Sequence, residues 1–105
     1  MSSERERFEA RQIRGLILST LKDYYPNGLS GATIVKQVVR PVFPATDQRD
    51  AVAFLIMLKD AGYVESIKEL GIRKADSLLD QHFRSTPKGI EIAEGTSSDP
   101  SIVVE

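Results

Sequence analysis

The spacing of apolar residues in the first quarter of the chain predicts a long helix. They recur at intervals of three and four, which places them on one helical face: Ile13, Leu16, Ile17, Leu21 and Tyr24. A strong turn signal, Tyr25-Pro-Asn-Gly28, follows. We therefore expect the first helix to span residues 5–25. Gly15 lies in its middle at a cost of about 1 kcal/mol against alanine, and a close packing contact would explain it.

A second helix is predicted over residues 30–39. Ser30 is a suitable N-cap, because its hydroxyl can accept a hydrogen bond from the first helical turn. Two prolines, Pro41 and Pro44, follow the apolar positions of this helix. Proline disrupts a helix interior and disfavours helical backbone in the residue before it. We therefore expect residues 40–44 to form a rigid, non-helical connection.

The third helix is predicted over residues 47–61, with Thr46 as its N-cap. Val52, Leu55 and Leu58 fall at helical spacing and form its inward side, with Ile56 as a further candidate. Gly62 then provides the left-handed residue that commonly ends a helix.

Two strands and a short helix complete the expected elements. The residues from 63 to 68 are rich in β-branched and aromatic side chains, which suits a strand, and a second strand is expected at 82–86. The two should pair. Thr86 can cap a final helix from Pro87 to Glu94, because proline is well tolerated in the first helical turn.

Three phrases of the chain resemble winged helix-turn-helix regulators of the PadR-like and MarR-like kind. Leu58-Lys-Asp-Ala-Gly-Tyr-Val-Glu65 is similar to the end of their third helix, and Phe83–Gly95 to the line that closes their wing. The segment Leu16–Val38 is similar to their opening helices. Together the likeness covers about residues 13–95. From local chemistry alone, an ordinary α+β domain with a hairpin remains the alternative.

The resemblance implies a mainly α member of the α+β class. It has three helices, a two-stranded β-wing and a short C-terminal helix. This winged-helix domain would occupy residues 1–95, and residues 96–105 would form a flexible acidic tail. The resemblance further implies a dimeric transcription regulator that binds double-stranded DNA and places its third helix in the major groove.

The charge distribution favours DNA binding only weakly. The chain carries a net charge of −1, but four acids and no base follow Gly89, so residues 1–89 carry +3. The predicted DNA contacts are basic or amide side chains on the second helix, the third helix and the wing: Lys36, Arg40, Gln48, Arg49, Arg73 and Lys74. Further candidate phosphate contacts are Arg7, Arg11, Arg14 and Lys68.

The wing segment 69–81 has two interpretations. Gly71 with Arg73 and Lys74 would form a basic tip that contacts the DNA backbone or minor groove. Alternatively, the segment is a hairpin excursion with Leu78 and Leu79 packed against the core.

The outward side of the third helix favours a different partner. From Thr46 to Gly62 it holds two basic and three acidic residues, and its acids would repel phosphates. Phe54 and Met57 lie where DNA-binding relatives usually carry polar residues. A protein-interaction module that uses the apolar third helix, with Phe54 and Met57, or the wing, without DNA binding, is therefore the alternative function.

Other classes of function find no support in the sequence. With no cysteine and only one histidine, His82, we expect no metal site and no thiol chemistry. No catalytic motif or phosphate-binding loop occurs, so we expect neither an enzyme nor a cofactor. The absence of an apolar signal or membrane segment favours the cytoplasm. The triplet Ile102-Val-Val104 is either a frayed end or an extra strand for a partner.

Overall fold

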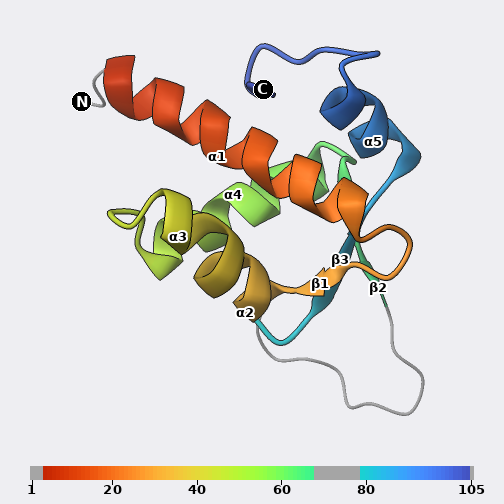
Figure 1. Cartoon of the computed structure of the whole chain (residues 1–105), viewed down its shortest axis with the longest axis horizontal. Helices are drawn as coiled ribbons and strands as arrows, with labels where there is room; N and C mark the ends of the chain where they lie inside the picture. Colours follow the sequence, from red (N-terminus) through yellow and green to blue (C-terminus); the bar gives the residue numbers. More distant parts are fainter. Residues whose placement is uncertain (1–3, 68–78, 105) are drawn as a thin grey trace.

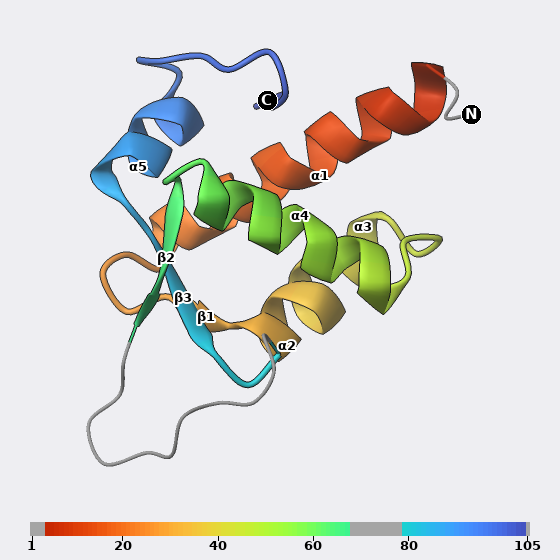
Figure 2. The same cartoon turned by 180° about the vertical axis from the view of Figure 1, so that it is seen from behind.

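The computed structural model describes residues 4–67 and 79–104, and within them the chain is mainly helical, with one small sheet. Helix α1 (Glu4–Asp23) runs along the molecule (Figure 1). Helix α4 (Gln48–Asp60) packs behind it, and α5 (Pro87–Glu94) lies beside its C-terminal half (Figures 1 and 2). These three helices match the predicted ranges closely.

The sheet contains one strand more than the sequence predicted. Strands β2 (Val64–Ile67) and β3 (His82–Ser85) pair antiparallel as expected, but β1 (Leu29–Ser30) pairs with the other edge of β3, which gives the order β1-β3-β2. The prediction of a two-stranded sheet was therefore incomplete. A two-residue strand has no alternating pattern to detect. Its approach depends on Gly28, where a Cβ would lie only 2.0 Å from the Phe83 carbonyl oxygen.

The second helical segment is longer than predicted and is not uniformly α-helical. It consists of α2 (Gly31–Thr33), a π-helical part η1 (Ile34–Val39) and α3 (Arg40–Val42) without a break. The π-type hydrogen bonding is seen where the Arg40 amide donates to the Val35 carbonyl, five residues earlier. The predicted cap is correct, since the Ser30 hydroxyl accepts from the Thr33 amide at 3.1 Å.

The expected end of this segment at residue 39 was wrong. Pro41 lies in the last turn of this continuous segment, and the Phe43 amide after it still donates to the Val39 carbonyl at 2.8 Å. The helix stops at Phe43, whose backbone leaves the helical region because Pro44 follows it. The sequence analysis also placed the N-cap of the third helix one residue too early, at Thr46. Asp47 rather than Thr46 caps α4, with its carboxylate accepting from the Asp50 amide at 2.8 Å.

One hydrophobic core joins the helices to the sheet. α1, η1 and α4 supply most of it, and the sheet, α5 and the C-terminal segment close it: Ile13, Ile17, Leu18, Leu21, Ile34, Val35, Val39, Leu55, Leu58, Val64, Phe83, Ile92 and Ile102. Leu79 is partly buried against this core, as the hairpin-excursion interpretation predicted, while Leu78 lies outside the described residues. Arg73 and Lys74 lie outside the described residues. The order helix, strand, helix, helix, hairpin, helix is consistent with a winged-helix-like fold.

The segment that the sequence analysis set apart as a flexible tail lies against α1 over its described part. Ile102 is 8 % exposed, the Val103 amide donates to the Arg11 carbonyl at 3.1 Å, and Arg14 donates to the Ser101 carbonyl at 2.7 Å. Gly15 makes this contact possible, because a Cβ there would lie 1.8 Å from the Val103 carbonyl oxygen. The packing contact expected at Gly15 is therefore present.

Asp99 fixes the start of this C-terminal segment. Its carboxylate accepts hydrogen bonds from the Ser101 hydroxyl at 2.6 Å, the Ser101 amide at 2.8 Å and the Tyr63 hydroxyl. These bonds, with that of the Ser101 hydroxyl the largest cause, hold the pKa of Asp99 below its usual range. The hydrogen bond between the Tyr63 hydroxyl and Asp99 is in turn the largest cause of the raised pKa of Tyr63.

We expect Gly15→Ala to destabilise the protein by about 1–3 kcal/mol, the usual cost of overpacking. In a helix interior without a close neighbour, the same change stabilises by about 1 kcal/mol, so the sign of the effect reports the contact with Val103. Urea denaturation of both proteins measures it. The control is Gly15→Ala in a chain that ends at Gly95. In the shortened chain, Gly15→Ala should be neutral or stabilising. An equal loss of unfolding free energy in the full-length and the shortened chain would contradict the contact with Val103.

Acid should remove the contribution of Asp99 to stability. Because the pKa of Asp99 is lower in the folded than in the unfolded protein, its carboxylate stabilises the fold above the unfolded pKa. This stabilisation is lost as the pH falls through the folded pKa. The difference in unfolding free energy between wild type and Asp99→Asn should therefore shrink below about pH 4. Urea midpoints over a pH series test this, with the exposed Asp60→Asn as control. A difference that stays constant would refute it.

Candidate nucleic-acid interface

The C-terminal end of α4 is closed by a glycine and continues directly into β2. Gly62 has a φ of +84°, and its amide donates to the Lys59 carbonyl at 3.0 Å. The Tyr63 amide donates back to the Leu58 carbonyl at 2.9 Å. This pair of bonds is the Schellman arrangement, which satisfies carbonyls that a helix end otherwise leaves unpaired. The direction of β2 is thereby set by the end of α4.

Thr86 ties the far side of the hairpin to the same point. Its hydroxyl donates to the Gly62 carbonyl at 2.6 Å and accepts from the Gly89 amide at 3.1 Å, so one side chain both caps α5 and holds the end of α4. Its amide donates to the Tyr63 carbonyl at 3.0 Å. The hairpin therefore leaves α4 and returns to within a hydrogen bond of it.

Lys88 adds a third link between α5 and the end of α4. Its ammonium group donates to the Ala61 carbonyl at 2.9 Å and lies 5.0 Å from the centre of the Tyr63 ring. Cations are favourable both at a helix C-terminus and over an aromatic face. Gly89 must be small here, since a Cβ would lie 2.1 Å from the Tyr63 carbonyl oxygen. The segments 58–65 and 83–95, which resemble the end of the third helix and the closing line of the wing, are thus in direct contact in the fold.

The outward face of α4 is open to solvent. In Figure 2 this helix lies in front, between the helical segment 31–42 and the β2–β3 hairpin. Gln48 and Arg49 are exposed in its first turn, and Ile56 and Met57 are 41 % and 44 % exposed further along. Phe54, which the sequence analysis grouped with Met57, is instead partly buried, and the Arg14 guanidinium lies 5.4 Å from the centre of its ring.

Besides Gln48, three of the predicted DNA contacts are exposed basic residues. Lys36 and Arg40 are exposed on the helical segment before α4, and Arg49 on α4 itself. Within residues 4–67 and 79–104, none of the three forms an ion pair. Arg84 differs, because it pairs with Glu65 across β2 and β3 at 2.5 Å. Arg73 and Lys74 fall outside the described residues, so the structure places only part of the predicted interface.

Arg14 is held within the structure rather than presented at this face. It is half-buried between Phe54 and the C-terminal segment, and burial lowers its pKa. Its Nε is buried without a hydrogen-bond partner among the described residues. Of the other groups, His82 Nε2 donates to the Asn27 carbonyl oxygen at 3.0 Å. The described residues contain no cluster of acids and histidine suited to a metal ion.

The helices in the described ranges include none with both the length and the apolar character of a membrane span. No model of a known protein family matches the chain, and no curated protein matches it in sequence. Among solved structures, the chain is similar to the crystal structure of F-93 from SSV1. The two are 19 % identical, the match covers 80 % of each chain, and the TM-score is 0.58. At this identity the likeness shows the fold alone.

Proposed function

We propose that this chain is a small DNA-binding protein of the winged-helix kind that acts as a transcription regulator and carries out no catalysis. One observation carries the proposal. The exposed face of α4 is held in a fixed position beside the hairpin, and cations without an ion-pair partner in the described ranges lie on it and on the preceding helix. In helix-turn-helix proteins, the helix in this position enters the major groove.

The chemistry of α4 predicts binding with little sequence preference. Gln48 and Arg49 lie in its first turn, where such helices contact base edges, and these residue types read adenine and guanine. Asp50 is exposed beside them and repels phosphate. Ile56 and Met57 offer no hydrogen bonds to bases. Most of the affinity must therefore come from phosphate contacts by Lys36, Arg40 and Arg49, in a dimer that spans two half-sites.

Binding to a random-sequence duplex should therefore depend steeply on salt. Each phosphate contact contributes about 0.9 units to the slope of log affinity against log salt concentration. The double variant Arg40→Ala, Arg49→Ala should flatten this slope by about two units. Fluorescence anisotropy titrations at several salt concentrations measure it.

The matched control is Arg5→Ala, Lys22→Ala, which removes the same charge from α1 at positions that are not predicted DNA contacts. This control should lower affinity slightly through the overall field while it leaves the slope nearly unchanged. An equal flattening in both variants would place the DNA elsewhere. Wild-type protein without salt-sensitive affinity at concentrations on the order of 10 μM would end the DNA proposal.

The exposed Ile56 and Met57 favour a second candidate function, in which α4 binds protein, in the first instance a second copy of this chain. Met57→Asp would then place a charge in an apolar contact and dissociate the complex. Sedimentation equilibrium without DNA should show a wild-type dimer and a Met57→Asp monomer. Gln48→Asp, which adds the same charge at the far end of α4, serves as control. If Met57→Asp leaves the oligomeric state unchanged, α4 is not the protein contact.

A further inference from the structure

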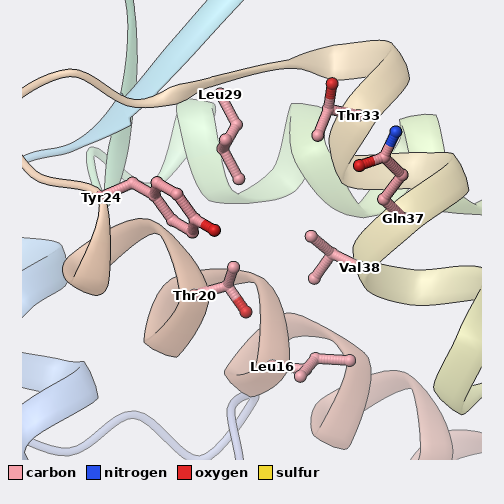
Figure 3. A pocket seen from close by; sticks show the side chains of 7 residues that line it. All are labelled: Leu16, Thr20, Tyr24, Leu29, Thr33, Gln37 and Val38. Carbon is pink, nitrogen blue, oxygen red and sulfur yellow. The ribbon is translucent and has the colours of Figure 1, made fainter.

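A groove lies between α1 and the helical segment 31–42, and the function proposed above does not use it. Its volume is about 380 Å³, which falls in the lower part of the range for small-molecule sites, roughly 300–1,000 Å³. The walls come from α1 and the turn after it, from β1, from α2 and from η1 (Figure 3). No lining residue carries a charge. The groove therefore offers no opposite charge to a charged ligand, which favours a neutral molecule.

Part of the lining is apolar. Leu16, Leu29 and Val38 point into the groove from three different elements (Figure 3). The Thr33 hydroxyl accepts a hydrogen bond from Ser30 at 2.9 Å and points away, so Thr33 presents its methyl group to the groove. These surfaces suit the faces and edges of a small apolar ring.

Three polar side chains are left for recognition, those of Thr20, Tyr24 and Gln37. The Tyr24 hydroxyl and the Gln37 carboxamide approach the groove from opposite sides, and neither has a hydrogen-bond partner within residues 4–67 and 79–104 (Figure 3). The carboxamide both donates and accepts, and the phenol does the same. The Tyr24 ring adds a flat aromatic surface along one wall. Together these groups select for a planar molecule with a polar edge.

The π-helical geometry of η1 supports a binding role for this wall. Gln37 and Val38 both belong to η1, while Val35 and Val39 of the same six residues are buried in the core. π-type hydrogen bonding is rare, and where it occurs it is frequently found at functional sites. Here it combines a core-facing side with a groove-facing side in one short segment.

We propose that this groove binds a small, neutral, planar aromatic molecule that carries an amide or a comparable donor–acceptor pair. Its ring packs between Tyr24 and the apolar side chains of Leu29 and Val38, and its polar edge bonds to Gln37. The groove is built by α1, β1 and the segment 31–42, which lie in front in Figure 1, whereas the exposed face of α4 is in front in Figure 2. The site therefore lies away from the exposed face of α4, although Lys36 and Arg40 of the proposed DNA interface belong to the same segment 31–42.

Benzamide is a suitable probe because it is neutral, planar and carries one amide. Titration followed by ¹⁵N–¹H correlation spectra should shift the amide signals of Leu29, Thr33, Gln37 and Val38, with a dissociation constant on the order of 1 mM. Signals from α4 and α5 should not move. Benzoate tests the requirement for neutrality, and cyclohexanecarboxamide tests the requirement for a flat ring. Both should bind at least several-fold more weakly.

Variants on the groove wall decide whether the binding is specific. Gln37→Ala and Tyr24→Ala should each weaken benzamide binding by about tenfold, and both positions are exposed, so the fold should persist. Lys36→Ala, next to Gln37 but outside the groove, should leave binding unchanged. Shifts scattered over the surface, equal binding of the three probes, or shifts insensitive to both wall variants would overturn the proposal. None of these outcomes bears on DNA binding, which is measured separately.

Discussion

Three consecutive carbonyls at the end of α4 are the point on which the arrangement of the molecule depends. Those of Ala61, Gly62 and Tyr63 accept hydrogen bonds from the Lys88 ammonium, the Thr86 hydroxyl and the Thr86 amide respectively. Carbonyls at a helix end stay unpaired unless other groups donate hydrogen bonds to them. Here the donors follow the hairpin in sequence, so these bonds join α4, β2, β3 and α5 into one unit. The angle between α4 and the hairpin therefore does not depend on the exposed side chains of either.

A second close contact, at Gly15, determines what the two sides of α1 can do. The backbone of Val103 lies where a side chain would be, so the C-terminal segment covers one side of the helix and contributes Ile102 to the core. Leu16 and Thr20 face the groove instead. A small chain has little apolar surface to bury, and using a segment of acidic and polar composition as a cover is one way to extend the core. The groove stays open because no described part of the chain reaches it.

The success of the sequence analysis follows the strength of the local signals. Thr86, Pro87 and Gly62 have specific backbone roles that few residues can fill, so α5 and the end of α4 were predictable. β1 was not, because Leu29 and Ser30 are too short a run to show alternation. The π-helical hydrogen bonding within 31–42 produces no recognisable periodicity in the sequence. The burial of Ile102 was not predicted because the residues before it are mostly polar. Tyr24 and Gln37 belong to separate elements, so only the fold brings them to one groove.

The position of α4 and its chemistry are set by different parts of the sequence, which explains why they point to different partners. Backbone bonds at Gly62 and Thr86 hold the helix whatever its outward residues are. Among the acids near its start, Asp47 is already engaged as the N-cap, where the helix dipole stabilises its charge. Asp50 is then the principal obstacle to phosphate. The outward face of α4 has Arg49 at one end and Met57 at the other. Very few substitutions on it would therefore change its preference between DNA and protein, and none of them would involve the bonds that hold the helix in place.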